Sequence, residues 1–166
     1  MKTMVNEFSE YARAPKLNLE STDINETIIE ISHLFENSGI KITTNLLKGL
    51  PKIKVDANMM RQVLINLVQN AQDAMVNNTK KPSIKINTNK YKSYLILSIE
   101  DNGPGFSEDI LKKAFEPYVT TKSHGTGLGL AIVKKIIEEH EGTIIIENIK
   151  SGGAHINIQL PISKSK

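Results

Sequence analysis

The chain has 166 residues, enough for one compact domain with a short appendage. It contains no cysteine, which excludes a disulfide scaffold and a cysteine nucleophile, and its scattered lysines with only two arginines argue against a nucleic-acid partner. No apolar stretch is long enough to span a bilayer and no signal-peptide core opens the chain, so we expect a cytoplasmic protein without direct membrane contact.

Apolar periodicity predicts an α+β protein. Before Pro15 there is a short helical pattern, followed by a linker over 13–21. Longer helices are predicted over 23–37, 57–77 and about 130–142, the first capped by Asp23 with Glu26. Strands are predicted over 40–47, 52–56, 83–89, 94–101, 143–149 and 155–160. We expect a two-layer sandwich, with a mixed, mostly antiparallel five-stranded sheet covered on one face by three helices.

The polar side of the helix over 57–77 has an unusual composition. Asn66, Asn70 and Asp73 lie on one side, where Lys and Glu would be better helix formers. Asparagine carbonyls are hard oxygen ligands that suit Mg²⁺ bound together with phosphates. The alternative is a polar, solvated helix face.

The segment after the strand over 94–101 is a second candidate. Asp101 continues the buried row of that strand, and a carboxylate in this position needs hydrogen-bond donors. An adenine amino group could supply one, and Gly103 and Gly105 would let the base approach closely. An ordinary Asp-Gly turn is the alternative.

A glycine run over 125–130 leads directly into a helix. Backbone amides at a helix start can hold phosphate, but no Lys-Ser/Thr follows as in a Walker A loop, and the spacing fits a Rossmann fingerprint poorly. The preceding segment, 115–122, is interpreted as a hinged lid that brings Lys122 to the phosphates, or else as a surface loop with one aromatic anchor.

Together these four segments resemble the ATP-binding catalytic domain of two-component sensor histidine kinases, a branch of the GHKL (Bergerat-fold) superfamily. Residues 66–74 are similar to the N box of that family, 101–105 to its G1 box, 115–117 to its F box and 125–130 to its G2 box. Residues 6–16 resemble the end of the dimerisation hairpin of NtrY-like kinases. The resemblance implies a dimerisation remnant and linker over 1–19 and a catalytic domain over 20–163.

The resemblance also implies the site residues and the reaction. ATP would be bound with Mg²⁺, Asn70 would hold the metal, Asn66 and Lys122 would act in transfer, and the lid would run from about Pro117 to Thr126. The implied nucleotide-binding residues are Asn66, Asn70, Asp73, Asp101, Gly103, Gly105, Phe115, Thr121, Lys122, Gly125, Thr126, Gly127, Leu128 and Gly129. The γ-phosphoryl group would pass to a histidine on a separate dimerisation domain, and then to the receiver domain of a response regulator.

Two features limit what this chain would do alone. None of its four histidines (His33, His124, His140 and His155) stands in the phosphoacceptor context of the family, so each is interpreted as a surface or structural residue. We therefore expect a fragment, monomeric and without the acceptor helix, whose parent could be anchored in the inner membrane. The family often has glycine where Glu141 stands and threonine near Ala154.

The choice between functions depends on Asn66. Hydrolysing members of the superfamily, such as gyrases, typically carry glutamate there, and an amide cannot act as a general base at neutral pH. Asn66 therefore favours transfer over hydrolysis. Two alternatives remain: another GHKL enzyme, such as an anti-sigma-type serine kinase or a weak ATPase, and a non-catalytic nucleotide-sensing module.

Overall fold

The computed structural model describes residues 16–77, 79–116 and 129–162. Its helices are α2 (Ile24–Leu34), α3 (Ala57–Met75), α4 (Glu108–Lys112) and α5 (Gly129–Glu139). Its strands are β1 (Glu20–Thr22), β2 (Lys41–Asn45), β3 (Ile53–Val55), β4 (Ser83–Tyr91), β5 (Tyr94–Asp101), β6 (Thr143–Asn148) and β7 (Ala154–Pro161).

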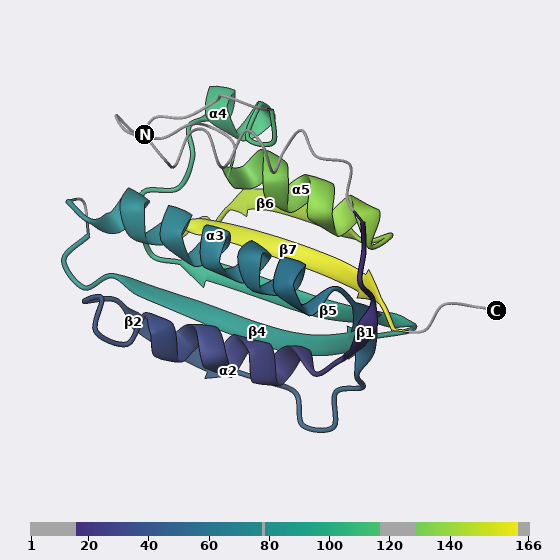
Figure 1. Ribbon diagram of the computed structural model, residues 1–166. Helices are drawn as coiled ribbons and strands as arrows, with labels where there is room; N and C mark the ends of the chain where they lie inside the picture. Colours follow the sequence, from purple (N-terminus) through teal and green to yellow (C-terminus); the bar gives the residue numbers. More distant parts are fainter. Residues whose placement is uncertain (1–15, 78, 117–128, 163–166) are drawn as a thin grey trace.

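Five strands form one sheet in the order β2-β4-β5-β7-β6. Only the β2–β4 pair is parallel, and the other neighbours are antiparallel. Helices α2, α3 and α5 lie side by side over one face of this sheet (Figure 1). The expected two-layer α+β sandwich is confirmed.

Residue alternation in the strands creates the core. Leu95, Leu97 and Ile99 of β5 are buried on the helix side, and Ile156 and Ile158 of β7 face the same layer. The apolar stripes of the three helices cover these positions, so that strand and helix residues share one core cluster. An aspartate side chain caps the N-terminus of α2 and of α3. Asp23 accepts a hydrogen bond from the backbone N–H of Glu26, and Asp56 accepts one from that of Met59.

Three elements differ from the sequence-based expectation. The strand expected over 52–56 is not part of the large sheet, because β3 pairs with β1 in a separate two-stranded sheet. Since β1 starts at Glu20, the linker expected over 13–21 ends earlier. A one-turn helix, α4, which the side chain of Ser107 caps, lies between the segments 101–105 and 115–122, where the sequence analysis predicted no helix. In the described part of the chain, no helix has the length and apolar character needed to cross a membrane.

Candidate functional site

The first residue of α5 lies against the polar side of α3. A Cβ atom on Gly129 would be 3.4 Å from Nδ2 and 3.6 Å from Oδ1 of Asn70. These are ordinary van der Waals distances, so the backbone of α5 begins directly beside the Asn70 amide. The structure thereby brings Gly129, at the end of the predicted glycine run, to the helix face over 66–74, as the sequence predicted; residues 125–128 of that run lie outside the described part of the chain.

The polar side of α3 offers amide groups at this position. Asn66 lies one helical turn before Asn70, and both residues are half-buried, whereas Asp73 is exposed. Within the described residues, the Asn66 side chain makes no hydrogen bond. A half-buried amide that is not used within the fold can donate to a ligand and accept from it.

Asp101, at the end of β5, is the third component of the site. Its Oδ1 accepts hydrogen bonds from the backbone N–H of Gly103 at 2.9 Å and from that of Ala154 at 3.3 Å. Burial raises the pKa of Asp101, and these two backbone hydrogen bonds oppose the rise. Oδ2 accepts no hydrogen bond from the described residues, so it remains available to a donor from outside.

The Asp101 loop lies at the C-terminal end of α3. A Cβ atom on Gly103 would come within 2.7 Å of the Met75 Cγ, so only glycine lets this loop pack against the helix. Met75 follows Asn70 by five residues, about 7.5 Å along the helix axis at 1.5 Å per residue. The loop that follows Asp101 therefore packs against the C-terminal end of α3, five residues beyond Asn70 in that helix.

The next part of the loop is held by β6. Gly105 has a φ of +76°, and a Cβ atom there would lie 2.8 Å from the Asn148 Oδ1. The Asn148 amide accepts from the backbone N–H of Phe106 at 2.8 Å and donates to its carbonyl at 2.6 Å. This double hydrogen bond fixes the path of the chain beyond Gly105, so glycine is needed there for both conformation and space.

Phe115 occupies a different position from the groups around Asn70. It is half-buried, packs against the core, and has the Lys134 Nζ 5.0 Å from its ring centroid, a cation–π contact with α5. Its role in nucleotide binding stays a prediction. Six of the predicted site residues lie outside the described part of the chain: Thr121, Lys122, Gly125, Thr126, Gly127 and Leu128.

Sequence comparison identifies the family. Residues 55–164 match the family described as histidine kinase-, DNA gyrase B- and HSP90-like ATPases, which is well over half of the chain. The chain belongs to this family. It is 35% identical to a putative sensor histidine kinase NtrY-like of Rickettsia bellii and 35% identical to the nitrogen regulation protein NtrY of Azorhizobium caulinodans. These alignments cover 100% and 95% of this chain but only 27% and 21% of the relatives, so it spans about a quarter of their length.

Solved structures agree. The catalytic domain of the histidine kinase ThkA superposes with a TM-score of 0.78 at 34% identity, covering 87% of this chain and 96% of that one. Full-length ShkA in complex with AMPPNP gives a TM-score of 0.83 at 27% identity, over 98% of this chain and 36% of ShkA. ThkA in complex with the response regulator TrrA gives 0.81 at 31%, over 98% and 47%. Within the ATPase family, this chain is a histidine-kinase catalytic domain.

Two contributions to this histidine-kinase site were missed by the sequence analysis. Gly153, with a φ of +98°, lies so close to the Asp101 carbonyl oxygen that a Cβ atom would collide with it, and the next residue donates its N–H to Asp101. Asn102 has a structural role: its amide accepts from the Ser83 N–H at 2.8 Å and donates to the Lys81 carbonyl at 2.9 Å. The Gly152-Gly153 pair is the signal in the sequence, but between two predicted strands it indicates only a turn.

The oxygen donors on α3 can be compared with those that Mg²⁺ takes in proteins. The described residues contain no group of three or more His, Cys, Asp or Glu side chains that could cage an ion. The polar side of α3 instead offers amide oxygens on neighbouring turns. Such a partial set suits Mg²⁺, which is usually bound by one or two protein oxygens together with water and substrate phosphates.

Proposed function

We propose that this domain binds ATP with Mg²⁺ between α3 and α5, and that it transfers the γ-phosphoryl group to a histidine of a partner domain in two-component signalling. The observation that carries the proposal is the contact of Gly129 with Asn70, with the Asp101 loop packed on the same helix at Met75. This contact supports a site in which a metal-compatible amide, a helix start and a carboxylate oxygen would hold one nucleotide.

Adenine recognition is assigned to Asp101. The Oδ2 atom, which is unused within the described residues, would accept a hydrogen bond from the exocyclic amino group of the base. The backbone donors of Gly103 and Ala154 keep the carboxylate in place by holding Oδ1. Because Gly103 has no side chain, the base can lie close to the loop. A site that pairs a base amino group in this way discriminates against bases that lack one.

Phosphate binding is assigned to α3 and the start of α5. The first turn of α5 carries backbone amides that have no carbonyl partner within the helix, together with the positive end of the helix dipole, and Gly129 adds no side chain beside them. Asn70 would hold the metal and Asn66 would orient the phosphates. A Mg²⁺ ion held there would supply positive charge that offsets the negative charge of the phosphates.

The transfer step requires a nucleophile from another helix. An imidazole nitrogen would attack the γ-phosphorus, so that a P–N bond forms while the P–O bond to the β-phosphate breaks and ADP leaves. Lys122 would neutralise charge during this step. Asn66 cannot take a proton from water, which favours transfer over hydrolysis. We further propose that the phosphoryl group continues to the receiver domain of a response regulator, in line with the ThkA–TrrA complex.

The organisation of the chain is proposed on the same basis. Residues 1–19 would be the end of a dimerisation helix with its linker, and 20–163 the catalytic domain; β1 beginning at Glu20 supports this boundary. The domain would work in the cytoplasm as a monomeric fragment, and its parent kinase could be anchored in the inner membrane.

A phosphotransfer assay tests this function. The chain is incubated with Mg²⁺, γ-labelled ATP and a histidine-bearing dimerisation domain, with Asn70→Ala as the matched inactive variant. We expect label on the dimerisation domain that is lost in acid and retained in base, as for phosphohistidine. Acid-stable label would instead indicate a serine kinase, release of inorganic phosphate alone an ATPase, and binding without turnover a sensing module.

A further inference from the structure

Hydrogen bonds of one buried histidine link the start of α3 to the end of α5. These are the helix ends far from Asn70 and Gly129. The link is built around His140, directly after α5, and Asp56, directly before α3, which are only 3% and 7% exposed. The His140 Nδ1 lies 2.7 Å from the Ile136 carbonyl oxygen, and its Nε2 lies 3.0 Å from the backbone nitrogen of Asp56.

The partners of His140 determine its protonation state. A carbonyl oxygen can only accept, so Nδ1 must carry the proton that it donates to Ile136. The Asp56 N–H can only donate, so Nε2 must be unprotonated. The ring is therefore a neutral imidazole in the Nδ1–H tautomer. The imidazolium form and the other tautomer would each put a hydrogen against the Asp56 N–H.

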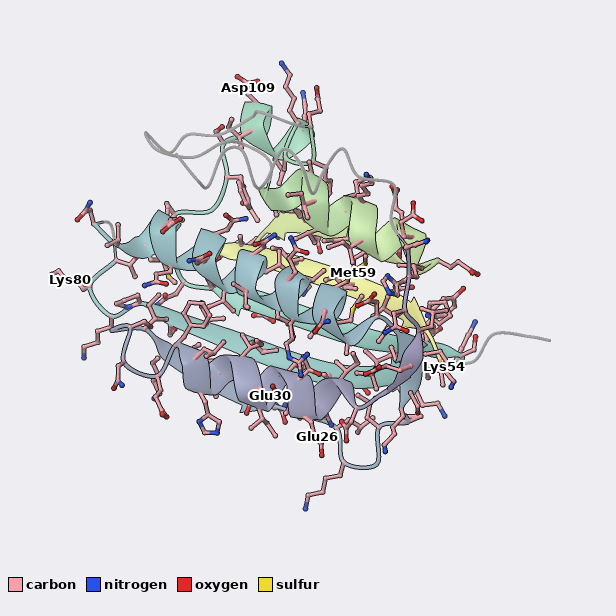
Figure 2. All side chains as sticks on the ribbon, viewed as in Figure 1. Glu26, Glu30, Lys54, Met59, Lys80 and Asp109 are labelled. Atoms are coloured by element: carbon pink, nitrogen blue, oxygen red, sulfur yellow. The ribbon has the colours of Figure 1, made fainter. Side chains whose placement is uncertain are left out.

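Both carboxylate oxygens of Asp56 also have hydrogen-bond partners. Its Oδ1 accepts from the Met59 N–H at 3.1 Å and caps α3, and its Oδ2 accepts from the Asn18 N–H at 3.0 Å. The imidazole thus contacts a backbone group that is itself fixed at the first turn of α3. Lys54, on the adjacent β3, lies at the end of the molecule opposite to Lys80, which follows α3 (Figure 2).

The two helices run antiparallel, so this attachment is remote from the nucleotide groups. Asp56 to Asn70 spans about 21 Å along α3, and Gly129 to His140 about 17 Å along α5, at 1.5 Å per residue. The buried residues Val133 and Ile137 hold α5 by apolar packing, which is non-directional. A hydrogen bond is a directional restraint on the axial position of α5, because its strength falls steeply when the distance or angle between donor and acceptor departs from the optimum.

We propose that His140 is a positioning residue of the nucleotide site. By accepting from the Asp56 N–H, it sets the axial position of α5 relative to α3, and so the separation between the Gly129 backbone and the Asn70 amide. The inference rests on the proposed function, since that separation matters only if the Gly129 backbone and the Asn70 amide together hold the phosphates and their metal. A displacement of about 1 Å in such a site can cost two orders of magnitude in rate.

Side-chain amides separate the two hydrogen bonds of His140. In His140→Gln the amide oxygen can replace Nε2 as acceptor, whereas in His140→Asn the amide nitrogen can replace only the Nδ1 donor, and His140→Leu removes both. His33→Gln and His33→Asn, at an exposed histidine on α2, are the matched controls. For each protein, the Kd is measured for AMPPNP with Mg²⁺ and for adenosine, below the melting transition.

The ratio of the two affinities is the decisive readout. Adenosine relies on Asp101, which is on β5, whereas AMPPNP also needs α5. We expect His140→Asn and His140→Leu to weaken AMPPNP about tenfold with adenosine changed less than about twofold, and His140→Gln to stay within about threefold of the wild type. A merely structural histidine would lower the melting temperature and leave the ratio unchanged, which would overturn the proposal, as would a His140→Gln variant no better than His140→Leu.

A second measurement needs no variant. The ¹⁵N chemical shifts of the His140 ring in the wild-type chain show which nitrogen carries the proton. A protonated Nδ1 and a bare Nε2 are expected, and a protonated Nε2 would contradict the proposal. If the wild type fails to bind AMPPNP while the ring shifts are as expected, the proposed function fails rather than the geometry of the histidine.

Discussion

The polar groups at the two ends of the α3–α5 pair differ in whether they have hydrogen-bond partners within the fold. At the His140 end, both ring nitrogens and both Asp56 carboxylate oxygens have partners within the fold. At the Asn70 end, within the described residues, the Asn66 amide and one oxygen of Asp101 have none. Since polar groups away from solvent are normally paired, we interpret the Asn66 amide and the second Asp101 oxygen as groups for a ligand, and the His140–Asp56 pair as a structural attachment of the two helices.

The strongest test of the open end is Asn70→Ala. It should weaken Mg²⁺-dependent ATP binding at least about 100-fold, roughly 2.7 kcal/mol, because it removes the proposed metal ligand. The melting temperature of the nucleotide-free domain should stay within a few degrees, because Asn70 lies on the polar side of α3. Gln69→Ala, at the exposed neighbour, is the control and should change neither quantity. Unfolding of the nucleotide-free variant would show that Asn70 is a structural residue.

The packing around Asp101 is tested by Gly153→Ala. The added Cβ would collide with the Asp101 carbonyl oxygen, and the φ of +98° is strained for any side chain. We expect the free energy of unfolding in urea to fall by about 2–4 kcal/mol. Gly152→Ala is the matched control, because its φ is +115° but no atom lies within 4 Å, so only backbone strain should appear. Equal losses in the two variants would exclude a close approach at Gly153.

Asp101→Asn separates ligand binding from stability. Replacing Oδ2 by an amide nitrogen turns an acceptor into a donor that faces the adenine amino group, so ATP affinity should fall about 10-fold or more, with inorganic triphosphate unaffected. Glu100→Gln, on the other side of β5, is the control. Equal losses for ATP and triphosphate would contradict the adenine role.

The same variant has a defined pH dependence. Burial raises the pKa of Asp101 above its ordinary value of 3.8 in the folded state. Below pH 3.8 the carboxyl is protonated in both the folded and the unfolded chain. As the pH rises, the unfolded chain loses this proton first, because its pKa is the lower one. The free energy of unfolding therefore falls until the pH has passed the raised pKa of the folded state. Asp101→Asn lacks this decline, and its stability relative to the wild type should therefore grow between acid and neutral pH in urea titrations.

The smallest effect is expected at the turn that follows His140. Glu141 has a φ of +61°, in the left-handed region that favours glycine, and the family that the sequence resembles often has glycine at this position. Glu141→Gly should raise the free energy of unfolding by up to about 1 kcal/mol. Lys92→Gly, at the other described non-glycine residue with positive φ, should show a similar gain. No gain at either position would mean that the side chains compensate for the strain.

Much of the site could be predicted from the sequence because its residues obey local rules. The cap at Asp23, the helix beginning at Ala57 and the buried side of Asp101 all follow from periodicity and residue type. The remainder depends on contacts between distant segments. The Ala154 N–H that donates to Asp101 is a backbone group, so no residue type in the sequence marks it. Asp56, whose N–H donates to His140, is 84 residues away from that histidine in sequence. Strand β1 has three residues, too few for a periodic pattern.

The most direct test of the account follows two backbone amides during one titration. Gly103, beside Asp101, and Gly129, beside Asn70, are observed by NMR while AMPPNP is added in the presence of Mg²⁺. We expect both amides to shift with one common Kd, between about 1 μM and 1 mM, and the shift at Gly129 to shrink most when Mg²⁺ is left out. Shifts that saturate at different concentrations, or a shift at only one of the two glycines, would contradict a single nucleotide bound between β5, α3 and α5.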